Sequence, residues 1–199
     1  MMVRVGTSEA NWAARVARSV SAAPRRGRRV RVVSVEGRSG SGKSTVAERV
    51  RRELAAIDEP VATLTMEDLY PGWEGLEQAP ELLRAWVLEP LAEGRSAAWR
   101  RYDWERGVFE ERWRSLPEEL AEGGTLLVEG CGSGAGVVRD SIDVLVWVAA
   151  PDRLRRARLD AREDADLYAP FRALWARQEE SLYSRDHPRE RADLVVDNS

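Results

Sequence analysis

Five short apolar runs, rich in β-branched residues, recur along the chain and alternate with segments of helical periodicity. The runs occupy residues 30–36, 61–66, 125–130, 142–148 and 192–197. Continuous apolar runs of this length are typical of strands that are buried on both faces of a parallel sheet. Helices are predicted at residues 46–57, 80–91, 152–163 and from Asp166 onward. The pattern predicts a doubly wound α/β fold, with a five-stranded parallel sheet between two helical layers, in one domain without internal repeats.

The segment before the first predicted strand is amphipathic and then basic. A helix is expected over residues 8–20, with Ser8 as its N-cap, and its apolar face is formed by Trp12, Val16 and Val20. This helix should pack outside the sheet. The basic run at 25–29 is expected to be a solvated linker, with a polyanion site as the less favoured alternative. We therefore divide the chain into an N-terminal helix and linker, residues 1–29, and a main domain, residues 30–199.

Residues 95–114 interleave arginines with aromatic residues. Alternation on both sides of the Arg106-Gly107 turn predicts a short hairpin, within an insertion that spans about residues 70–114. The aromatic side chains either line a pocket for a flat base and its phosphate or form a satellite hydrophobic cluster. The sequence favours neither alternative.

The turn between the first predicted strand and the next helix is rich in glycine and contains a lysine. It reads Gly37-Arg38-Ser39-Gly40-Ser41-Gly42-Lys43-Ser44-Thr45 and fits G-x-x-x-x-G-K-[ST], the phosphate-binding P-loop, in the strand–loop–helix context that this motif requires. Glycines let main-chain N–H groups approach an anion, and the helix N-terminus adds a positive potential. Lys43 should reach the β- and γ-phosphates, and the Ser44 hydroxyl should bind Mg²⁺. The residues expected to bind the nucleotide are Gly37, Ser39, Gly40, Ser41, Gly42, Lys43, Ser44 and Thr45.

Acidic residues follow two of the predicted strands. Glu67 and Asp68 come after the second strand, and Glu129 ends the third in the position of a Walker B acid. Open α/β sheets bind ligands beyond the carboxyl ends of their strands, so these acids should face the nucleotide. Because successive strand residues point to opposite faces, one of Glu67 and Asp68 should accept the proton of an acceptor hydroxyl, and the other could hold Mg²⁺ through water. Ser44 and Glu129 are the expected metal ligands.

The predicted helix after the fourth strand is crowded with arginines. Arginines stand at positions 153, 155, 156, 158 and 162. A charged run on a helix is usually a solvated face, but the place of this helix in a P-loop fold is also that of a phosphate-clamping lid. We favour a lid at about residues 152–163 and keep the solvated face as the alternative.

Composition excludes several other kinds of site. The formal net charge of −3 gives no reason to expect binding to nucleic acid or to a membrane. The single cysteine, Cys131, excludes an intrachain disulfide, and together with the single histidine, His187, it leaves too few ligands for structural zinc. No apolar run approaches transmembrane length, so we expect a cytoplasmic protein.

The kind of P-loop protein can be narrowed by elimination. A GTPase reads guanine with an Asn-Lys-x-Asp segment, and the only lysine of this chain is already in the P-loop. A transporter-type ATPase would have a Ser-Gly-Gly-rich signature, and the sequence contains none. The remaining class is a small kinase.

Five segments, taken in order, resemble the uridine kinase family within the nucleoside and nucleotide kinases. They are the P-loop, Glu67-Asp68-Leu69-Tyr70, Tyr102-Asp103-Trp104, Val128-Glu129-Gly130 and the Arg-Leu-x-Arg helix at 153–156. The resemblance covers roughly residues 30–197 and implies the P-loop NTPase fold, a three-layer α/β/α sandwich.

The resemblance also assigns roles by position. It implies that Glu67 is the catalytic acid, where the family has aspartate, with Asp68 beside it. The acceptor site would include Tyr70, Tyr102, Asp103 and Trp104, and the lid arginines would be Arg156 and Arg162. Trp104 replaces a phenylalanine or tyrosine, and the histidine that often follows this segment is missing.

These observations predict an ATP- and Mg²⁺-dependent kinase that phosphorylates a hydroxyl of a small molecule, with a nucleoside as the leading acceptor. The alternatives are another hydroxyl acceptor, such as pantothenate, a sugar or an antibiotic, and a nucleotide-binding regulatory protein without turnover. The expected partners are a nucleotide and a small-molecule acceptor, with neither nucleic acid nor membrane. The sequence leaves the oligomeric state open, with a homodimer as one option.

Overall fold

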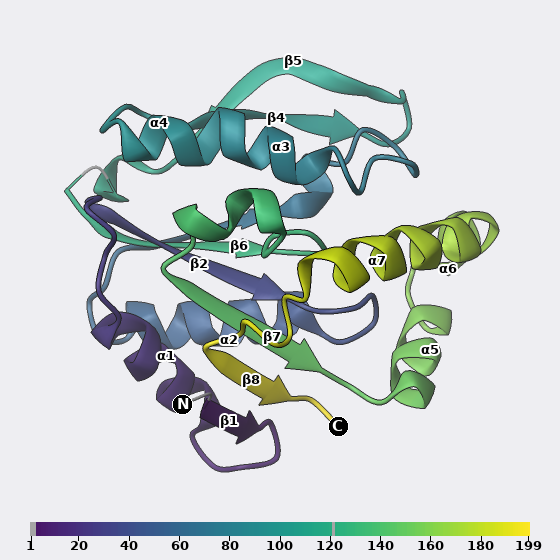
Figure 1. Ribbon diagram of the computed structural model, residues 1–199, viewed down its shortest axis with the longest axis horizontal. Helices are drawn as coiled ribbons and strands as arrows, with labels where there is room; N and C mark the ends of the chain where they lie inside the picture. The colour runs from purple at the N-terminus through teal and green to yellow at the C-terminus, as the bar shows by residue number, and fades with distance from the viewer. Residues whose placement is uncertain (1–2, 121) are drawn as a thin grey trace.

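The computed structural model describes residues 3–120 and 122–199 (Figure 1). Its strands are β1 (Val3–Gly6), β2 (Val30–Glu36), β3 (Val61–Thr65), β4 (Ala98–Asp103), β5 (Val108–Ser115), β6 (Gly124–Glu129), β7 (Val144–Ala149) and β8 (Leu194–Asp197). Its α-helices are α1 (Trp12–Ala22), α2 (Lys43–Ala55), α3 (Ala79–Leu83), α4 (Glu89–Ala92), α5 (Asp152–Asp160), α6 (Ala165–Tyr168) and α7 (Arg172–Asp186). Shorter helical turns are η1 (Met66–Asp68), the π-helical η2 (Arg84–Leu88), η3 (Glu118–Leu120), η4 (Gly136–Ser141) and η5 (Ala169–Phe171). Within the described residues, no helix is both long and apolar enough to cross a membrane.

Six of the strands form one parallel sheet in the order β1-β8-β7-β2-β6-β3. β2 lies inside the sheet and pairs with β6 on one side and β7 on the other, so that Val33 is opposite both Leu127 and Val144. Because all the strands run the same way, the carboxyl ends of β2, β3, β6 and β7 lie at one end of the sheet. The predicted parallel α/β fold is confirmed, and this end is where ligands are expected.

The alternation of side chains along each strand divides the core into two clusters. In β2, Val32 belongs to one buried cluster, whereas Val33 and Val35 belong to the other. Helices α1 and α2 cover the second face, and α3, α4 and α7 lie on the opposite side of the sheet (Figure 1). The sheet is therefore buried on both faces, which explains why its strands read as continuous apolar runs.

An edge strand that the sequence does not predict adds a sixth member to the sheet. β1 pairs with β8, and Val5 lies opposite Val196. Val5 is the only buried residue of its four. A segment so short, with a single buried side chain, has too little apolar pattern to be recognised. The prediction of five strands is therefore wrong by one, and the segment before β2 contributes a strand as well as a helix.

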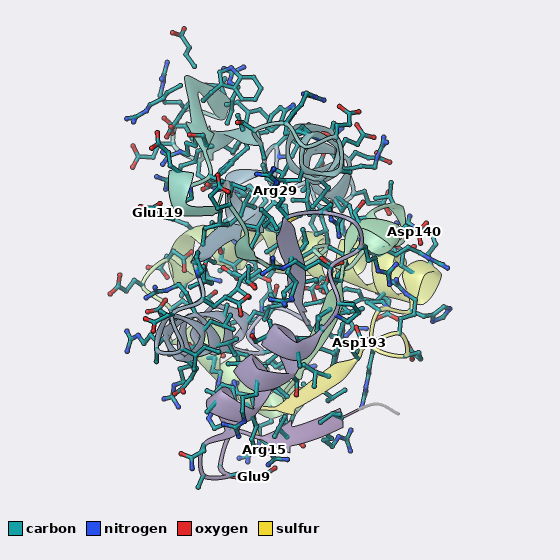
Figure 2. All side chains as sticks on the ribbon, turned by 90° about the vertical axis from the view of Figure 1, so that its left-hand side faces the viewer. Glu9, Arg15, Arg29, Glu119, Asp140 and Asp193 are labelled. Atoms are coloured by element: carbon teal, nitrogen blue, oxygen red, sulfur yellow. The ribbon has the colours of Figure 1, made fainter. Side chains whose placement is uncertain are left out.

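Helix α1 begins at Trp12 rather than near Ser8. Asn11 precedes it in a left-handed conformation, and no side chain caps the helix. Ser8 lies in the turn before the helix, where Glu9 pairs with Arg15 (Figure 2). The predicted N-cap is therefore wrong, but the predicted apolar face is confirmed, since it is buried against the sheet through Trp12, Val16 and Val20.

The basic run before β2 is not simply a solvated linker. The Arg28 side chain is only 5% exposed and forms an ion pair with Asp143 at 3.0 Å. The same carboxylate accepts hydrogen bonds from the main-chain N–H groups of Arg26, at 2.9 Å, and Val32, at 2.7 Å. Asp143 therefore ties the entrance of β2 to the start of β7. Arg29, by contrast, is exposed, as the linker prediction expects.

The predicted hairpin is present as the antiparallel pair β4–β5, which stands apart from the main sheet (Figure 1). Its register shifts between Arg100 and Tyr102. The Trp99 indole is buried and donates from Nε1 to Asp68 in η1, at 2.9 Å. The hairpin is thus anchored to the carboxyl end of β3, at the ligand-binding end of the sheet.

Candidate active site

The P-loop connects β2 to α2 and adopts conformations that only glycine tolerates. Gly40 has φ +76° and Gly42 has φ +92°. A Cβ atom on Gly40 would lie 2.4 Å from the carbonyl oxygen of Arg155, and one on Gly42 would lie 2.3 Å from Nδ2 of Asn198. Glycine is therefore required both by backbone angle and by close packing. Helix α2 begins directly after Gly42, so its N-terminus opens toward the loop.

Lys43 extends across the loop toward its first residues. Its Nζ donates to the carbonyl oxygen of Gly37 at 2.8 Å and to that of Arg38 at 3.3 Å. Burial alone would lower the pKa of Lys43, but the nearby carboxylates of Glu179, Glu36 and Glu129 act in the opposite direction, and the pKa is raised. The ammonium is therefore charged at neutral pH, as a phosphate ligand must be.

Ser44 and Glu129 meet at the carboxyl end of β6. The Ser44 Oγ lies 3.2 Å from each carboxylate oxygen of Glu129. Burial raises the pKa of Glu129, and the nearby Lys43 ammonium opposes that rise. A hydroxyl and a carboxylate are the hard oxygen ligands that suit Mg²⁺. No set of three ligating side chains is found within the described residues, so a bound Mg²⁺ would complete its shell with phosphate oxygens and water.

The two acids after β3 point to different surroundings. They lie in η1, where the Thr65 hydroxyl caps the turn by accepting from the N–H of Glu67. Glu67 lines the pocket described below, whereas Asp68 accepts from the Trp99 indole and lies 3.6 Å from Nε of Arg101. Both acids lie at the carboxyl end of β3, but only Glu67 lines the pocket.

Aromatic rings from four segments surround the space beyond Glu67. Trp73 is central: its ring centroid lies 4.7 Å from Trp104 of the hairpin and 4.7 Å from Phe171, on which it stacks. Tyr168 and Trp175 pack around the same ring. Trp104 also donates from Nε1 to the carbonyl oxygen of Glu67, at 3.3 Å. The sequence did not single out Trp73, Tyr168 or Trp175 as site residues. An aromatic residue that lines a pocket cannot be distinguished in sequence from one that packs in a core.

Two of the three predicted acceptor residues of the hairpin have other contacts. Asp103 Oδ1 accepts from the N–H groups of Glu105, at 3.0 Å, and Arg106, at 2.9 Å, and so caps the hairpin turn. Tyr102 packs edge-on against Trp104. Neither Tyr102 nor Asp103 lines the pocket, whereas Trp104 does. The hairpin thus contributes one pocket wall, Trp104, with Tyr102 packed against it, and binding of a base there stays a prediction.

The arginines of α5 divide into two groups. Arg155 donates to the carbonyl oxygen of Ser39 at 3.0 Å, and Arg158 donates to that of Ser41 at 3.2 Å. Arg156 is exposed and lies outside the pocket, whereas Arg162, just beyond the helix, lines it. In the sequence, positions 155, 158 and 162 are spaced by three and four, as on one face of a helix, although α5 itself ends at Asp160. That spacing is the sequence signal that could have added Arg158 to the candidates.

These groups enclose one pocket of about 850 Å³. Of the residues proposed from the sequence, the pocket is lined by Ser39, Gly40, Gly42, Lys43, Ser44, Thr45, Glu67, Tyr70, Trp104, Glu129 and Arg162. Gly37 and Ser41 belong to the P-loop but are buried behind its lining. The Tyr70 hydroxyl is already used, since it donates to the carbonyl oxygen of Cys131 at 2.9 Å. The pocket therefore joins a phosphate cradle to an aromatic chamber, formed by Trp73, Trp104, Tyr168 and Trp175, and Glu67 belongs to the same lining.

A family model described as an AAA domain matches residues 33–193 of the chain. A solved structure of a possible uridine kinase from Bacillus stearothermophilus is 19% identical, with a TM-score of 0.67, over 93% of this chain and 97% of that one. A provisionally assigned fructose transport system kinase from Silicibacter sp. TM1040 is 20% identical, with a TM-score of 0.59, over 92% and 98%. At these identities the two structures show a shared fold, the P-loop NTPase-like α/β fold. No protein of curated function matches the chain.

Proposed function

The chain belongs to the AAA-domain family, and on this premise we propose that it is a kinase that transfers the terminal phosphoryl group of ATP to a hydroxyl of a small molecule, with a nucleoside as the leading acceptor. One observation carries the proposal: the carboxylate of Glu67 and the ammonium of the P-loop lysine, Lys43, line the same pocket. A kinase needs a phosphate cradle and a proton acceptor within reach of one another.

Each part of the pocket has a role in this reaction. Main-chain N–H groups of the P-loop and the Lys43 ammonium bind the phosphates. Arg158 and Arg162 add positive charge from the lid, where charge develops during transfer. Ser44 and Glu129 would hold Mg²⁺, which neutralises phosphate charge when it is bound.

The reaction transfers one proton and one phosphoryl group. The acceptor hydroxyl gives its proton to the Glu67 carboxylate as its oxygen bonds to the terminal phosphorus. The bond from that phosphorus to the bridging oxygen breaks, and the electron pair leaves with the diphosphate. Trp104 holds the main chain of Glu67 through its indole N–H, so the chamber wall and the base are fixed together.

The chamber supports an acceptor with a flat or ring-shaped body. Trp73, Trp104 and Tyr168 offer aromatic surface, on which bases stack and to which the apolar faces of sugars pack. A sugar acceptor is the second candidate, since it fits the same walls and one structural relative is described as a fructose transport system kinase. Pantothenate and antibiotics remain further candidate acceptors.

The test is steady-state turnover with ATP or GTP, Mg²⁺ and a panel of nucleosides, sugars, pantothenate and aminoglycosides. We expect one acceptor class to raise the release of nucleoside diphosphate well above the rate without acceptor. Lys43→Ala should abolish this stimulated release. If the protein binds nucleotide but no acceptor stimulates release, the regulatory alternative replaces the kinase proposal.

A further inference from the structure

Helix α7 carries a buried carboxylate that the proposed reaction does not use. Glu179 is 3% exposed. Its Oε1 accepts from the main-chain N–H of Ser39, at 2.9 Å, and from the Ser39 hydroxyl, at 2.5 Å. The Cys131 thiol donates to the same oxygen at 3.1 Å. Within the described residues the hydrogen bonds of Glu179 thus come from neutral donors, and two of the three belong to the P-loop.

A carboxylate in this place is unexpected on electrostatic grounds. A buried anion is unfavourable unless a cation or several donors compensate it. The Lys43 ammonium, whose pKa Glu179 helps to raise, lies 3.4 Å from the Cys131 sulfur and donates to loop carbonyl oxygens rather than to Glu179. The P-loop is built to bind phosphate, and Glu179 places a negative charge against its third residue, Ser39, which also lines the pocket.

We propose that Glu179 competes with the terminal phosphate of the bound nucleotide for the N–H and hydroxyl of Ser39. The inference rests on the proposed function, because it assumes that the P-loop binds a nucleoside triphosphate. Two anions cannot share one N–H donor at hydrogen-bond distance without strong repulsion. A nucleoside diphosphate lacks the γ-phosphate and should leave the contact between Glu179 and Ser39 intact.

This competition would help the transfer as well as weaken binding of the triphosphate. Repulsion between Glu179 and the terminal phosphate raises the energy of the bound triphosphate, and it is relieved as the phosphoryl group moves to the acceptor. An interaction that destabilises the bound substrate more than the transition state raises kcat at the cost of a higher KM. Glu179 is therefore a positioning residue that acts through Ser39.

The contact also links the phosphate site to the lid. The carbonyl oxygen of Ser39 accepts from Arg155 of α5, whereas its N–H and hydroxyl are held by Glu179 of α7. One turn later, the Tyr183 hydroxyl lies 3.1 Å from the carbonyl oxygen of Gly37. A terminal phosphate that displaces Glu179 thus loosens one of the contacts by which α7 holds the loop.

The variant that tests the proposal is Glu179→Gln, which keeps the length and one acceptor oxygen but removes the charge. Isothermal titration calorimetry would measure the affinity for a non-hydrolysable ATP analogue and for ADP, each with Mg²⁺. We expect the triphosphate analogue to bind about tenfold tighter than to the wild type, and ADP to change less than about twofold. KM for ATP and kcat should fall together.

The matched control is Glu180→Gln, which changes the next residue, an exposed acid that pairs with Arg38 at 2.7 Å. It should leave the ratio of the two affinities unchanged. Glu179→Met serves as a second variant if the glutamine variant is poorly folded. It should also raise the affinity for the triphosphate analogue relative to that for ADP.

Two results would overturn the inference. One is an equal change in both affinities, which would reduce Glu179 to a structural contact of α7. The other is weaker binding of the triphosphate analogue alone, which would mean that Glu179 favours binding of the γ-phosphate. A wild-type protein that binds neither nucleotide would instead overturn the proposed function, and the inference with it.

Discussion

The guanidinium of Arg162 lies 3.7 Å from the carboxylate of Glu67, between Nη2 and Oε1. Arg162 follows α5, and Glu67 follows β3, so this contact joins two pocket-lining segments that are distant in sequence. Arg162 also pairs with Asp164, which holds its guanidinium in place. The contact therefore places the proposed proton acceptor beside an arginine that lines the same pocket.

We therefore expect Glu67→Gln to abolish most of the activity. Glutamine keeps the shape and hydrogen-bonding reach but cannot accept the hydroxyl proton, so kcat should fall on the order of 10²–10⁴. Nucleotide affinity should be preserved, because Glu67 does not belong to the P-loop. Steady-state kinetics combined with calorimetry of nucleotide binding checks both statements.

Asp68→Asn is the matched control for this variant. Asparagine can still accept from the Trp99 indole, so we expect kcat within about threefold of the wild type, because a neutral hydrogen bond contributes only about 1 kcal/mol. An active Glu67→Gln with an inactive Asp68→Asn would mean that the base is the other acid.

The P-loop could be located from the sequence because its chemistry needs contiguous residues. Gly40, Gly42, Lys43 and Ser44 act as a local unit, so their spacing is visible without any tertiary information. The buried strands were equally visible, since the sheet is covered on both faces. The acid of β6 follows from the same logic, as its strand adjoins β2.

The remaining site residues depend on contacts that no local pattern records. Whether Glu67 or Asp68 enters the pocket is decided by Trp99, which binds Asp68 from the hairpin. Asp103 resembles an acceptor ligand in sequence, but its carboxylate caps the turn that follows. In the sequence, Glu179 is one of many polar positions in a long predicted helix. Only the packing of α7 against the P-loop shows that it is buried.

The lysine of the P-loop should not be replaceable. Lys43 is the only lysine among 31 Lys and Arg residues, and its Nζ lies within hydrogen-bond distance of two loop carbonyls. The planar guanidinium of Lys43→Arg is bulkier and cannot take that position as a compact charge. We expect Lys43→Arg and Lys43→Ala to lose turnover alike. Activity of Lys43→Arg close to the wild type would contradict the role assigned to this residue.

The lid arginines should differ in importance according to their contacts. Arg158→Ala removes a guanidinium that lines the pocket and holds two P-loop carbonyls, so kcat should fall on the order of 10². Arg162→Ala should act in the same direction. Arg156→Ala is the control, because Arg156 is exposed and outside the pocket, and it should leave kcat unchanged. A loss in Arg156→Ala equal to that in Arg158→Ala would show that the lid closes in another register.

The aromatic chamber should control the affinity for the acceptor. Trp104→Ala removes a pocket wall, and we expect KM for the acceptor to rise about tenfold, the scale of one aromatic stacking contact. KM for ATP should stay the same. Trp113→Ala is the matched control on the same hairpin, since Trp113 is 52% exposed and packs on Trp86 outside the pocket. Equal effects of the two substitutions on the acceptor would mean that the hairpin acts only through its stability.

The single cysteine should be resistant to alkylation, although it lines the pocket. Burial, together with the carboxylate of Glu179, raises the pKa of Cys131 to about 12, so the thiol is protonated at neutral pH. Because only the thiolate reacts, iodoacetamide at pH 8 should label the native protein on the order of 10³ times more slowly than a free cysteine. The rate should rise about tenfold per pH unit between pH 8 and pH 10, as the thiolate fraction does. Mass spectrometry follows the adduct, and the urea-unfolded chain should label at the free-cysteine rate. Rapid labelling of the native protein would show that Cys131 is ionised, and the charge balance around Lys43 and Glu179 would then need another cation.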